Sequence, residues 1–194
     1  MTNKKGIFVV ISGPSGVGKN TVADILINKG IGIYSVSMTT RNKRDGEVDG
    51  KDYFFVSKEE FDDNIKKDNF LEYAEYNDKC YGTLKSFVFD NLDNGVNVIA
   101  VVDIKGGANI EKIFPEAVLI FVMPPSFEEL EKRLRGRNTD SEENILKRLE
   151  IAQKEIDYSK NYDYIVVNND VDVCINEIEN IINKEILKIN NINN

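Results

Sequence analysis

Histidine and tryptophan are absent from this 194-residue chain, and cysteine occurs only twice. The lack of histidine excludes Ser-His-Asp triads, histidine metal ligands and histidine general bases, so catalysis must use Lys, Arg, Asp, Glu or backbone groups. Cys80 and Cys174 are too few and too far apart in sequence for a disulfide framework or a zinc site. We therefore expect reduced thiols and a cytoplasmic location.

Long hydrophobic runs and an excess of positive charge are also missing. The apolar run after the polar N-terminus stops at Ser12, which is too short for a secretory or membrane-spanning segment. The formal net charge of −8 disfavours nonspecific attachment to nucleic acid or to anionic membranes. We expect neither as a partner, and we leave the oligomeric state open. A phosphate site in such an acidic chain must concentrate its cations locally.

What is present is an alternation of apolar runs and amphipathic stretches. Runs typical of strands buried on both faces of a parallel sheet occupy residues 7–11, 96–102, 118–122 and 164–167. Stretches of helical period occupy residues 21–28, 126–135, 142–158 and 171–188. This alternation predicts an α/β core, a parallel sheet flanked by helices, formed by residues 1–34 and 84–194.

Residues 35–83 break that rhythm. Two apolar and aromatic runs, 53–56 and 70–76, flank a short helix-like stretch at 57–66. We predict an inserted lobe of mixed α+β structure here. A second departure is 133–148, whose Arg, Gly, Asn and acidic residues are typical of a solvent-exposed lid.

The segment Gly13-Pro-Ser-Gly-Val-Gly-Lys19 follows a predicted strand and precedes a predicted helix, which is the context of a P-loop. Its backbone N–H groups and the positive end of the helix favour phosphate, and Lys19 adds a full charge. The predicted ATP-binding residues of this segment are Gly13, Pro14, Ser15, Gly16, Val17, Gly18, Lys19, Asn20 and Thr21. Asn20 stands where a Ser or Thr hydroxyl usually meets Mg²⁺, the expected cofactor of ATP; its amide oxygen can replace that hydroxyl, or the ion stays on phosphates and water.

The inserted lobe resembles the guanylate kinase signature. Ser35 to Val56 contains Arg41, Arg44, an acidic residue, a glycine and a tyrosine at that family's spacings. Further matches follow at Phe70-Leu-Glu72, Tyr81-Gly-Thr83, Val102 to Gly106, Pro124-Pro-Ser126 and Lys132 to Arg137. The resemblance covers nearly the whole chain and implies a P-loop nucleoside monophosphate kinase. Its activity would be transfer of the γ-phosphoryl group of ATP to GMP, with dGMP as an expected second acceptor.

The resemblance also assigns the GMP-binding residues. The GMP phosphate would be held by Ser37, Arg41, Arg44, Tyr53 and Tyr81. Guanidinium groups suit this task because their planar donor pairs match phosphate oxygens. Glu72 would accept from guanine N1–H and the exocyclic amino group, and Thr83 would donate to O6. Such polar readout discriminates on the order of 10⁴-fold, so GMP is expected to be preferred clearly over AMP.

The lid and its surroundings complete the expected site. Arg133, Arg137 and Arg148 match the arginines that this family brings onto the triphosphate and the transferring group. With Lys19 and Arg41 they form the expected catalytic set, which acts by positioning and charge stabilisation.

Three positions near the strand ends concern the nucleotides and the metal. Asn168 resembles the family's loop beside the adenine ring, and Asp103 is placed near the guanine and the metal shell. Asp103 and Asn20 are the candidate metal contacts. Val101 stands where relatives commonly carry a second carboxylate.

Two other function classes remain open at this point. One is a guanylate-kinase-like scaffold module that binds phosphopeptides, against which the intact P-loop and the lid arginines argue. The other is a related P-loop kinase for another nucleotide or a phosphorylated metabolite. Glu72, Thr83 and the pair of arginines in the signature weigh against that second class.

Overall fold

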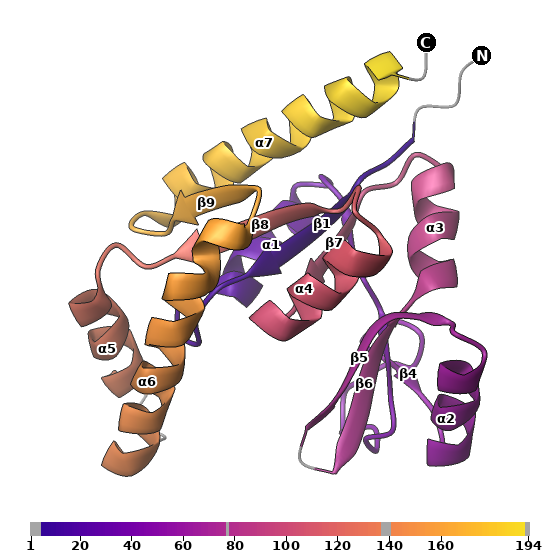
Figure 1. The fold of residues 1–194 in the computed structure, drawn as a ribbon, viewed down its shortest axis with the longest axis horizontal. Helices are drawn as coiled ribbons and strands as arrows, with labels where there is room; N and C mark the ends of the chain where they lie inside the picture. Colours follow the sequence, from indigo (N-terminus) through magenta and orange to yellow (C-terminus); the bar gives the residue numbers. More distant parts are fainter. Residues whose placement is uncertain (1–4, 77, 137–140, 193–194) are drawn as a thin grey trace.

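A five-stranded parallel sheet forms the centre of the chain, which the computed structural model describes over residues 5–76, 78–136 and 141–192 (Figure 1). The strands lie in the order β2-β7-β1-β8-β9. Their bounds are β1 Phe8–Ser12, β2 Ile33–Tyr34, β7 Val98–Val101, β8 Val118–Met123 and β9 Tyr164–Val167. Every neighbouring pair is parallel. The carboxyl ends of the strands therefore share one edge, where sheets of this type bind ligands.

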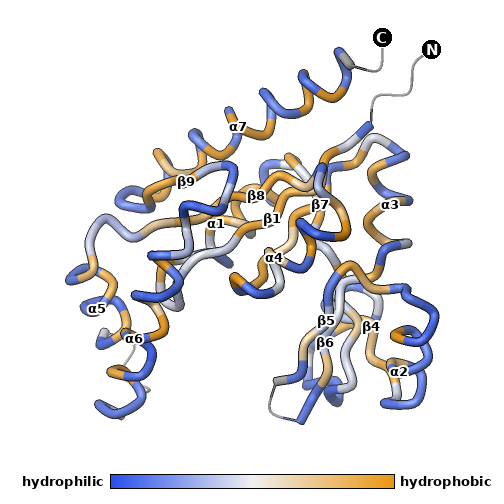
Figure 2. The backbone as a smooth tube through the Cα atoms, in the orientation of Figure 1, coloured by the Kyte–Doolittle hydropathy of each residue, from blue (hydrophilic) through white to orange (hydrophobic). Residues whose placement is uncertain are grey.

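Helices cover both faces of this sheet, as the predicted α/β class requires. One apolar cluster combines Val9 and Ile11 of β1 with side chains of α1 (Lys19–Asn28) and α7 (Val171–Ile192). On the opposite face, Phe8 and Val10 pack with α3 (Lys85–Asp93) and α4 (Ile104–Ile113). All of β1 is buried, which explains why its sequence is apolar without alternation. The apolar strands are visible as orange stretches at the centre of Figure 2.

A second sheet of four strands lies beside the first, in the order β4-β3-β6-β5. Its strands are β3 Ser37–Thr39, β4 Phe54–Phe55, β5 Phe70–Tyr76 and β6 Lys79–Leu84, and α2 covers Lys58–Lys66. The sheet has a small core of its own, formed by Met38, Phe61, Phe70 and Cys80. Leu71 of β5 is fully buried in the α3 and α4 cluster instead, so this residue ties the second sheet to the first.

The described residues of the predicted lid segment belong mostly to two helices. α5 spans Phe127–Arg135 and α6 spans Glu142–Tyr158, followed by the short η1 at Ser159–Asn161. Buried residues from both helices, among them Leu134 and Ile145, form a separate apolar cluster. Figure 1 shows α5 and α6 extending from the parallel sheet on the same side as the second sheet. Among the described residues, none of the helices is long and apolar enough to span a membrane.

Candidate active site

The P-loop connects β1 to α1 in a conformation that depends on glycine. Gly16 and Gly18 have φ values of 90° and 97°, in the region that side chains other than glycine rarely adopt. A Cβ atom on Gly13 would lie 2.3 Å from the carbonyl oxygen of Val122. Helix α1 starts without a side-chain cap and without an acidic residue in its first turn. Its first N–H groups and its positive end therefore form a site for an anion.

Two cations lie at this loop. The Lys19 Nζ atom donates to the carbonyl oxygens of Gly13 and Pro14, at 2.5 Å and 3.1 Å. Arg148, although it belongs to α6, places its Nη1 atom 3.4 Å from the Ser15 Oγ atom. The fold thus brings together a lysine and an arginine that are far apart in the sequence, as a triphosphate site requires.

Asn168 is hydrogen bonded to the P-loop. Its side chain is buried, and its Nδ2 atom donates to the Val17 carbonyl oxygen at 2.8 Å. The backbone carbonyl oxygen of Asn168 accepts a hydrogen bond from the Arg133 Nη1 atom at 3.1 Å. Asn168 therefore links β9, the P-loop and α5. Sequence reasoning missed this supporting contact, because no local pattern joins residues so distant along the chain.

The second sheet aligns several of the expected GMP ligands across neighbouring strands. Ser37 of β3 is paired with Thr83 of β6, which is paired with Glu72 of β5. Two residues before Thr83 on the same strand stands Tyr81, whose ring makes an edge contact with that of Tyr53 at 6.0 Å between centroids. Residues two apart on a strand project from the same face. One face of this lobe therefore presents hydroxyl groups and a carboxylate together.

Glu72 and Thr83 are already hydrogen bonded to each other. The Thr83 Oγ1 atom donates to the Glu72 Oε1 atom at 2.8 Å. Burial raises the pKa of Glu72, and the hydrogen bond from Thr83 partly opposes that rise. A desolvated carboxylate with one partner retains further acceptor capacity, which is a suitable arrangement for reading donors on a base.

The loop after β3 places Arg41 against a carboxylate that was not among the expected site residues. The Arg41 guanidinium donates to both Glu47 carboxylate oxygens, at 3.0 Å and 2.7 Å, and the Arg44 backbone N–H donates to the same carboxylate at 2.7 Å. These donors lower the pKa of Glu47 to about 2. The Arg44 side chain itself is exposed.

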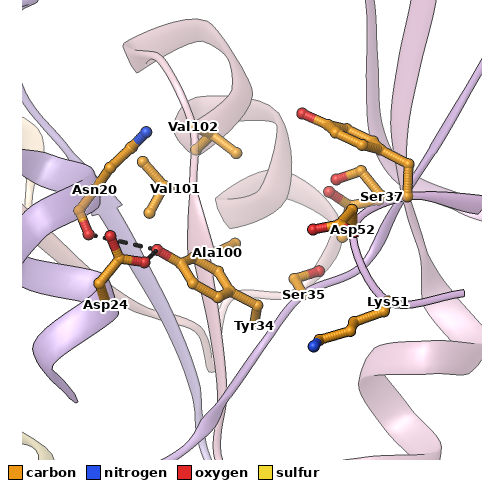
Figure 3. A pocket seen from close by; sticks show the side chains of 12 residues that line it. Asn20, Asp24, Tyr34, Ser35, Ser37, Lys51, Asp52, Ala100, Val101 and Val102 are labelled. Carbon is orange, nitrogen blue, oxygen red and sulfur yellow. Dashed lines mark hydrogen bonds between the residues drawn. The ribbon is translucent and has the colours of Figure 1, made fainter. Parts of the chain in front are cut away.

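A cavity of about 410 Å³ separates α1 from the second sheet. Figure 3 shows Asn20 and Asp24 of α1 on one side, Ser37 and Asp52 on the other, and Val101 between them. A second cavity of about 220 Å³ lies in the P-loop itself, and Asn20 lines that one as well. The P-loop cavity and the cavity beside the second sheet therefore meet at Asn20.

Two carboxylates, Asp24 and Asp52, line the cavity beside the second sheet. Among the residues that the structure describes, no group of three or more Cys, Asp or Glu side chains could hold a metal ion. The Asp103 Oδ1 atom accepts from the Gly106 N–H at 2.7 Å, so this carboxylate caps α4. Asp103 is exposed, so the bond stabilises the start of α4 rather than compensating a buried charge.

The lid arginines divide into two groups. Arg133 and Arg148 reach the P-loop and its support, as described above. Arg135 points elsewhere: it pairs with Glu131 at 2.8 Å and with Glu142 at 2.5 Å on the exposed surface. Arg137, the remaining expected lid arginine, lies outside the described residues.

Known proteins share this architecture. The family model described as guanylate kinase matches residues 5–185. A guanylate kinase of Caldanaerobacter subterraneus subsp. tengcongensis is 49% identical over 180 residues, which cover 92% of this chain and 87% of that protein. A guanylate kinase of Clostridium tetani is 45% identical, over 97% of this chain and 91% of that protein.

A solved structure gives the same answer in three dimensions. The crystal structure of guanylate kinase from Anaplasma phagocytophilum matches with a TM-score of 0.72 and 36% identity, over 95% of this chain and 88% of that one. The family match, these relatives and the shared fold all extend over nearly the full length of the sequence. This chain therefore belongs to the guanylate kinase family.

Proposed function

We propose that this chain transfers the γ-phosphoryl group of ATP to GMP, giving ADP and GDP in purine nucleotide metabolism, with dGMP as a second acceptor. One observation carries the proposal: the aligned Ser37, Thr83 and Glu72 belong to a lobe whose cavity meets the P-loop at Asn20. In this proposal, the guanine-reading residues and the triphosphate-binding loop lie around one junction. The guanylate kinase relatives support the same reaction.

On the donor side, the P-loop amides and the α1 N-terminus bind the ATP phosphates. Lys19, which now donates to loop carbonyls, turns to the β- and γ-phosphates. Arg148 and Arg133 neutralise charge on the transferring group, together with Arg137. Phosphoryl transfer requires positioning and electrostatic stabilisation more than covalent chemistry, so these cations suffice without histidine. Asn168 supports the loop and stays the expected neighbour of the adenine ring.

On the acceptor side, the GMP phosphate and base bind to separate parts of the second sheet. The phosphate ligands in this proposal are Ser37, Arg41, Arg44, Tyr53 and Tyr81. Glu72 accepts from the guanine N1–H and amino groups while Thr83 donates to O6. AMP lacks the donors that satisfy the buried carboxylate, which explains the expected preference for GMP.

Mg²⁺ accompanies ATP in this proposal. When bound, the ion would offset negative charge on the phosphates, and Asn20 and Asp103 would be its candidate protein contacts. The donor set fits an ion held mainly by phosphates and water, because Asn20 offers a neutral amide oxygen at the junction and the Asp103 carboxylate caps α4. The two cysteines are buried free thiols, which agrees with the reducing cytoplasm as the proposed location.

The test is ADP production from ATP and Mg²⁺ with GMP, dGMP, AMP, CMP or UMP supplied separately. We expect turnover with GMP and dGMP, and loss of turnover in Lys19→Met because that variant lacks the phosphate-binding charge. Turnover with AMP equal to that with GMP would refute the guanine assignment. Absence of turnover with every acceptor, combined with tight phosphopeptide binding, would establish a scaffold module instead.

A further inference from the structure

Glu47 has no assigned task in phosphoryl transfer, yet it forms the most enclosed ion pair of the second lobe described here. Its carboxylate accepts from Arg41 Nη1 at 3.0 Å and from Arg41 Nη2 at 2.7 Å. The Arg41 and Glu47 side chains are only 13% and 20% exposed, whereas the Lys66–Asp63 pair on α2 is 75% and 58% exposed. Enclosure and two-point geometry distinguish this pair from the exposed ion pairs that contribute little.

Two aromatic rings restrict the same guanidinium. The Arg41 Cζ atom lies 5.2 Å from the centroid of the Tyr53 ring and 5.6 Å from that of Phe55. Both distances are within the range of cation–π attraction. Arg41 Nη1 also donates to the Asn42 carbonyl oxygen at 2.8 Å. The guanidinium is therefore held at its end and against its faces before any nucleotide is bound.

The geometry of the Arg41–Glu47 ion pair decides which guanidinium N–H groups can face a ligand. A guanidinium has five N–H groups. The bonds to Glu47 and Asn42 use both hydrogens of Nη1 and one of Nη2. The Nε–H and the second Nη2 hydrogen form no bond with Glu47 or Asn42, and they lie along one edge as a parallel pair that matches two oxygens of a phosphate. The Tyr81 side chain, itself an expected phosphate ligand, is also hydrogen bonded to the Arg41 guanidinium, so a bound phosphate would share or replace that contact.

We propose that Glu47 is a positioning residue that holds Arg41 ready for the phosphate of GMP. The proposal rests on the assignment of Arg41 to that phosphate under the proposed function. Arg41 would otherwise have to lose the rotamer freedom of a long side chain each time GMP binds. Glu47 and the Tyr53 and Phe55 rings remove that freedom during folding. The backbone N–H of Arg44 fixes the carboxylate in turn.

The opposite role for Glu47 is a competing anion that blocks the phosphate site. The two roles predict opposite signs for the same substitution. Removing a negative charge beside a phosphate site strengthens phosphate binding by simple electrostatics, and a competing anion would add to that gain. A positioning residue predicts weaker binding despite the more favourable net charge.

The experiment measures GMP and guanosine affinities by calorimetry for the unaltered chain, Glu47→Ala, Arg41→Ala and the double variant. Guanosine lacks the phosphate, so the ratio of the GMP and guanosine affinities measures the contribution of the phosphate to binding. We expect Glu47→Ala to weaken GMP binding about 10- to 30-fold, the equivalent of re-ordering one long side chain. Guanosine affinity and the KM for ATP should stay within about twofold.

The control removes a negative charge from the same lobe without touching Arg41. Glu60 is exposed on α2, so Glu60→Gln should leave the ratio of GMP to guanosine affinity unchanged. Glu47→Gln keeps the side-chain length and one acceptor oxygen, and we expect it to fall between the unaltered chain and Glu47→Ala. This graded series keeps the proposal testable should the Ala variant fold poorly.

Four outcomes would overturn the proposal. They are tighter GMP binding in Glu47→Ala, equal losses for GMP and guanosine, additive effects of Arg41→Ala and Glu47→Ala, and a GMP affinity that Arg41→Ala leaves unchanged. The last result would remove Arg41 from the phosphate site while GMP turnover by the unaltered chain persisted. Lack of GMP turnover by the unaltered chain is a different result, and it would refute the proposed function itself.

Discussion

Glu72→Gln is expected to stabilise the free protein while it destroys recognition of guanine. The substitution keeps the shape of the side chain and the acceptor for Thr83 Oγ1, which donates to the Glu72 carboxylate at 2.8 Å. It removes the negative charge that the site has withdrawn from water. An amide also places a donor where the guanine N1–H and amino group need acceptors, so at least one hydrogen bond becomes a repulsive contact.

The loss of binding follows from two charge-assisted hydrogen bonds. Each is worth about 1.5 to 3 kcal/mol, so losing both costs about 3 to 6 kcal/mol. This corresponds to a fall of roughly 10²- to 10⁴-fold in kcat/KM for GMP. Because AMP gains nothing from the carboxylate, its kcat/KM should change little, and the ratio between the two acceptors should collapse.

The gain in stability follows from the sign of the pKa shift. Burial raises the pKa of Glu72 above its ordinary value of 4.5, so between the two values the folded protein binds more protons than the unfolded chain. The free energy of unfolding therefore falls as the pH rises from 4.5 through the folded-state pKa, and the penalty is complete above it. Glu72→Gln removes this penalty, so its Tm at pH 7 should exceed that of the unaltered chain.

Steady-state kinetics with GMP and AMP would test the predicted loss of guanine recognition. Thermal unfolding of the ligand-free protein between pH 4.5 and pH 8 would test the predicted gain in stability. Glu75→Gln is the matched control, since Glu75 is an exposed carboxylate on the same strand. An unchanged ratio of GMP to AMP turnover would exclude Glu72 as the guanine reader. A lower Tm for Glu72→Gln would show that the carboxylate stabilises the fold and that the burial argument is wrong.

Three further predictions concern the donor side. Asn168→Ala should lower the free energy of unfolding by about 1 to 3 kcal/mol and raise the KM for ATP, because the Val17 carbonyl oxygen loses its buried hydrogen-bond donor. A rise in KM confined to GMP would contradict this prediction. Arg148→Gln should lower kcat by about 10²-fold or more. Arg135→Gln removes only an exposed surface ion pair, so it should leave kcat within about twofold. Equal losses of kcat in steady-state assays would refute this separation of the two arginines. Asn20→Thr should reduce the Mg²⁺ concentration needed for half-maximal activity by supplying a hydroxyl, and a magnesium titration that shows no change would exclude Asn20 from the metal shell.

The elements with strong local patterns were predictable from the sequence. The structure has α6 at Glu142–Tyr158 and β9 at Tyr164–Val167, with the predicted bounds. Helical periodicity over many residues and a compact apolar run are both signals that do not depend on the rest of the fold. The P-loop was equally visible, because its glycines are required by local backbone geometry.

The elements that were missed have sequences shaped by distant contacts. Helix α4 carries a Gly-Gly pair, Gly106 and Gly107, in its first turn, and this pair weakens its helical pattern; a Cβ on Gly107 would lie 2.6 Å from the Tyr162 hydroxyl oxygen. In β6, Gly82 interrupts the strand pattern because the Phe70 ring packs against it, 2.8 Å from the position of a Cβ. Helices α5 and α6 were predicted, but their packing against each other was not, because it depends on contacts between residues of separate helices such as Leu130 and Leu149.

By itself, the sequence determined the α/β class, the phosphate loop and the residue types of an acceptor site, because each depends on neighbours a few positions apart. Only the tertiary structure decided how those residues combine. It aligned Ser37, Thr83 and Glu72 across three strands, turned Asn168 into the support of the P-loop and closed Glu47 onto Arg41. Strand register, burial and desolvation arise from packing between distant segments, and these set the charge, order and direction of each group at the site.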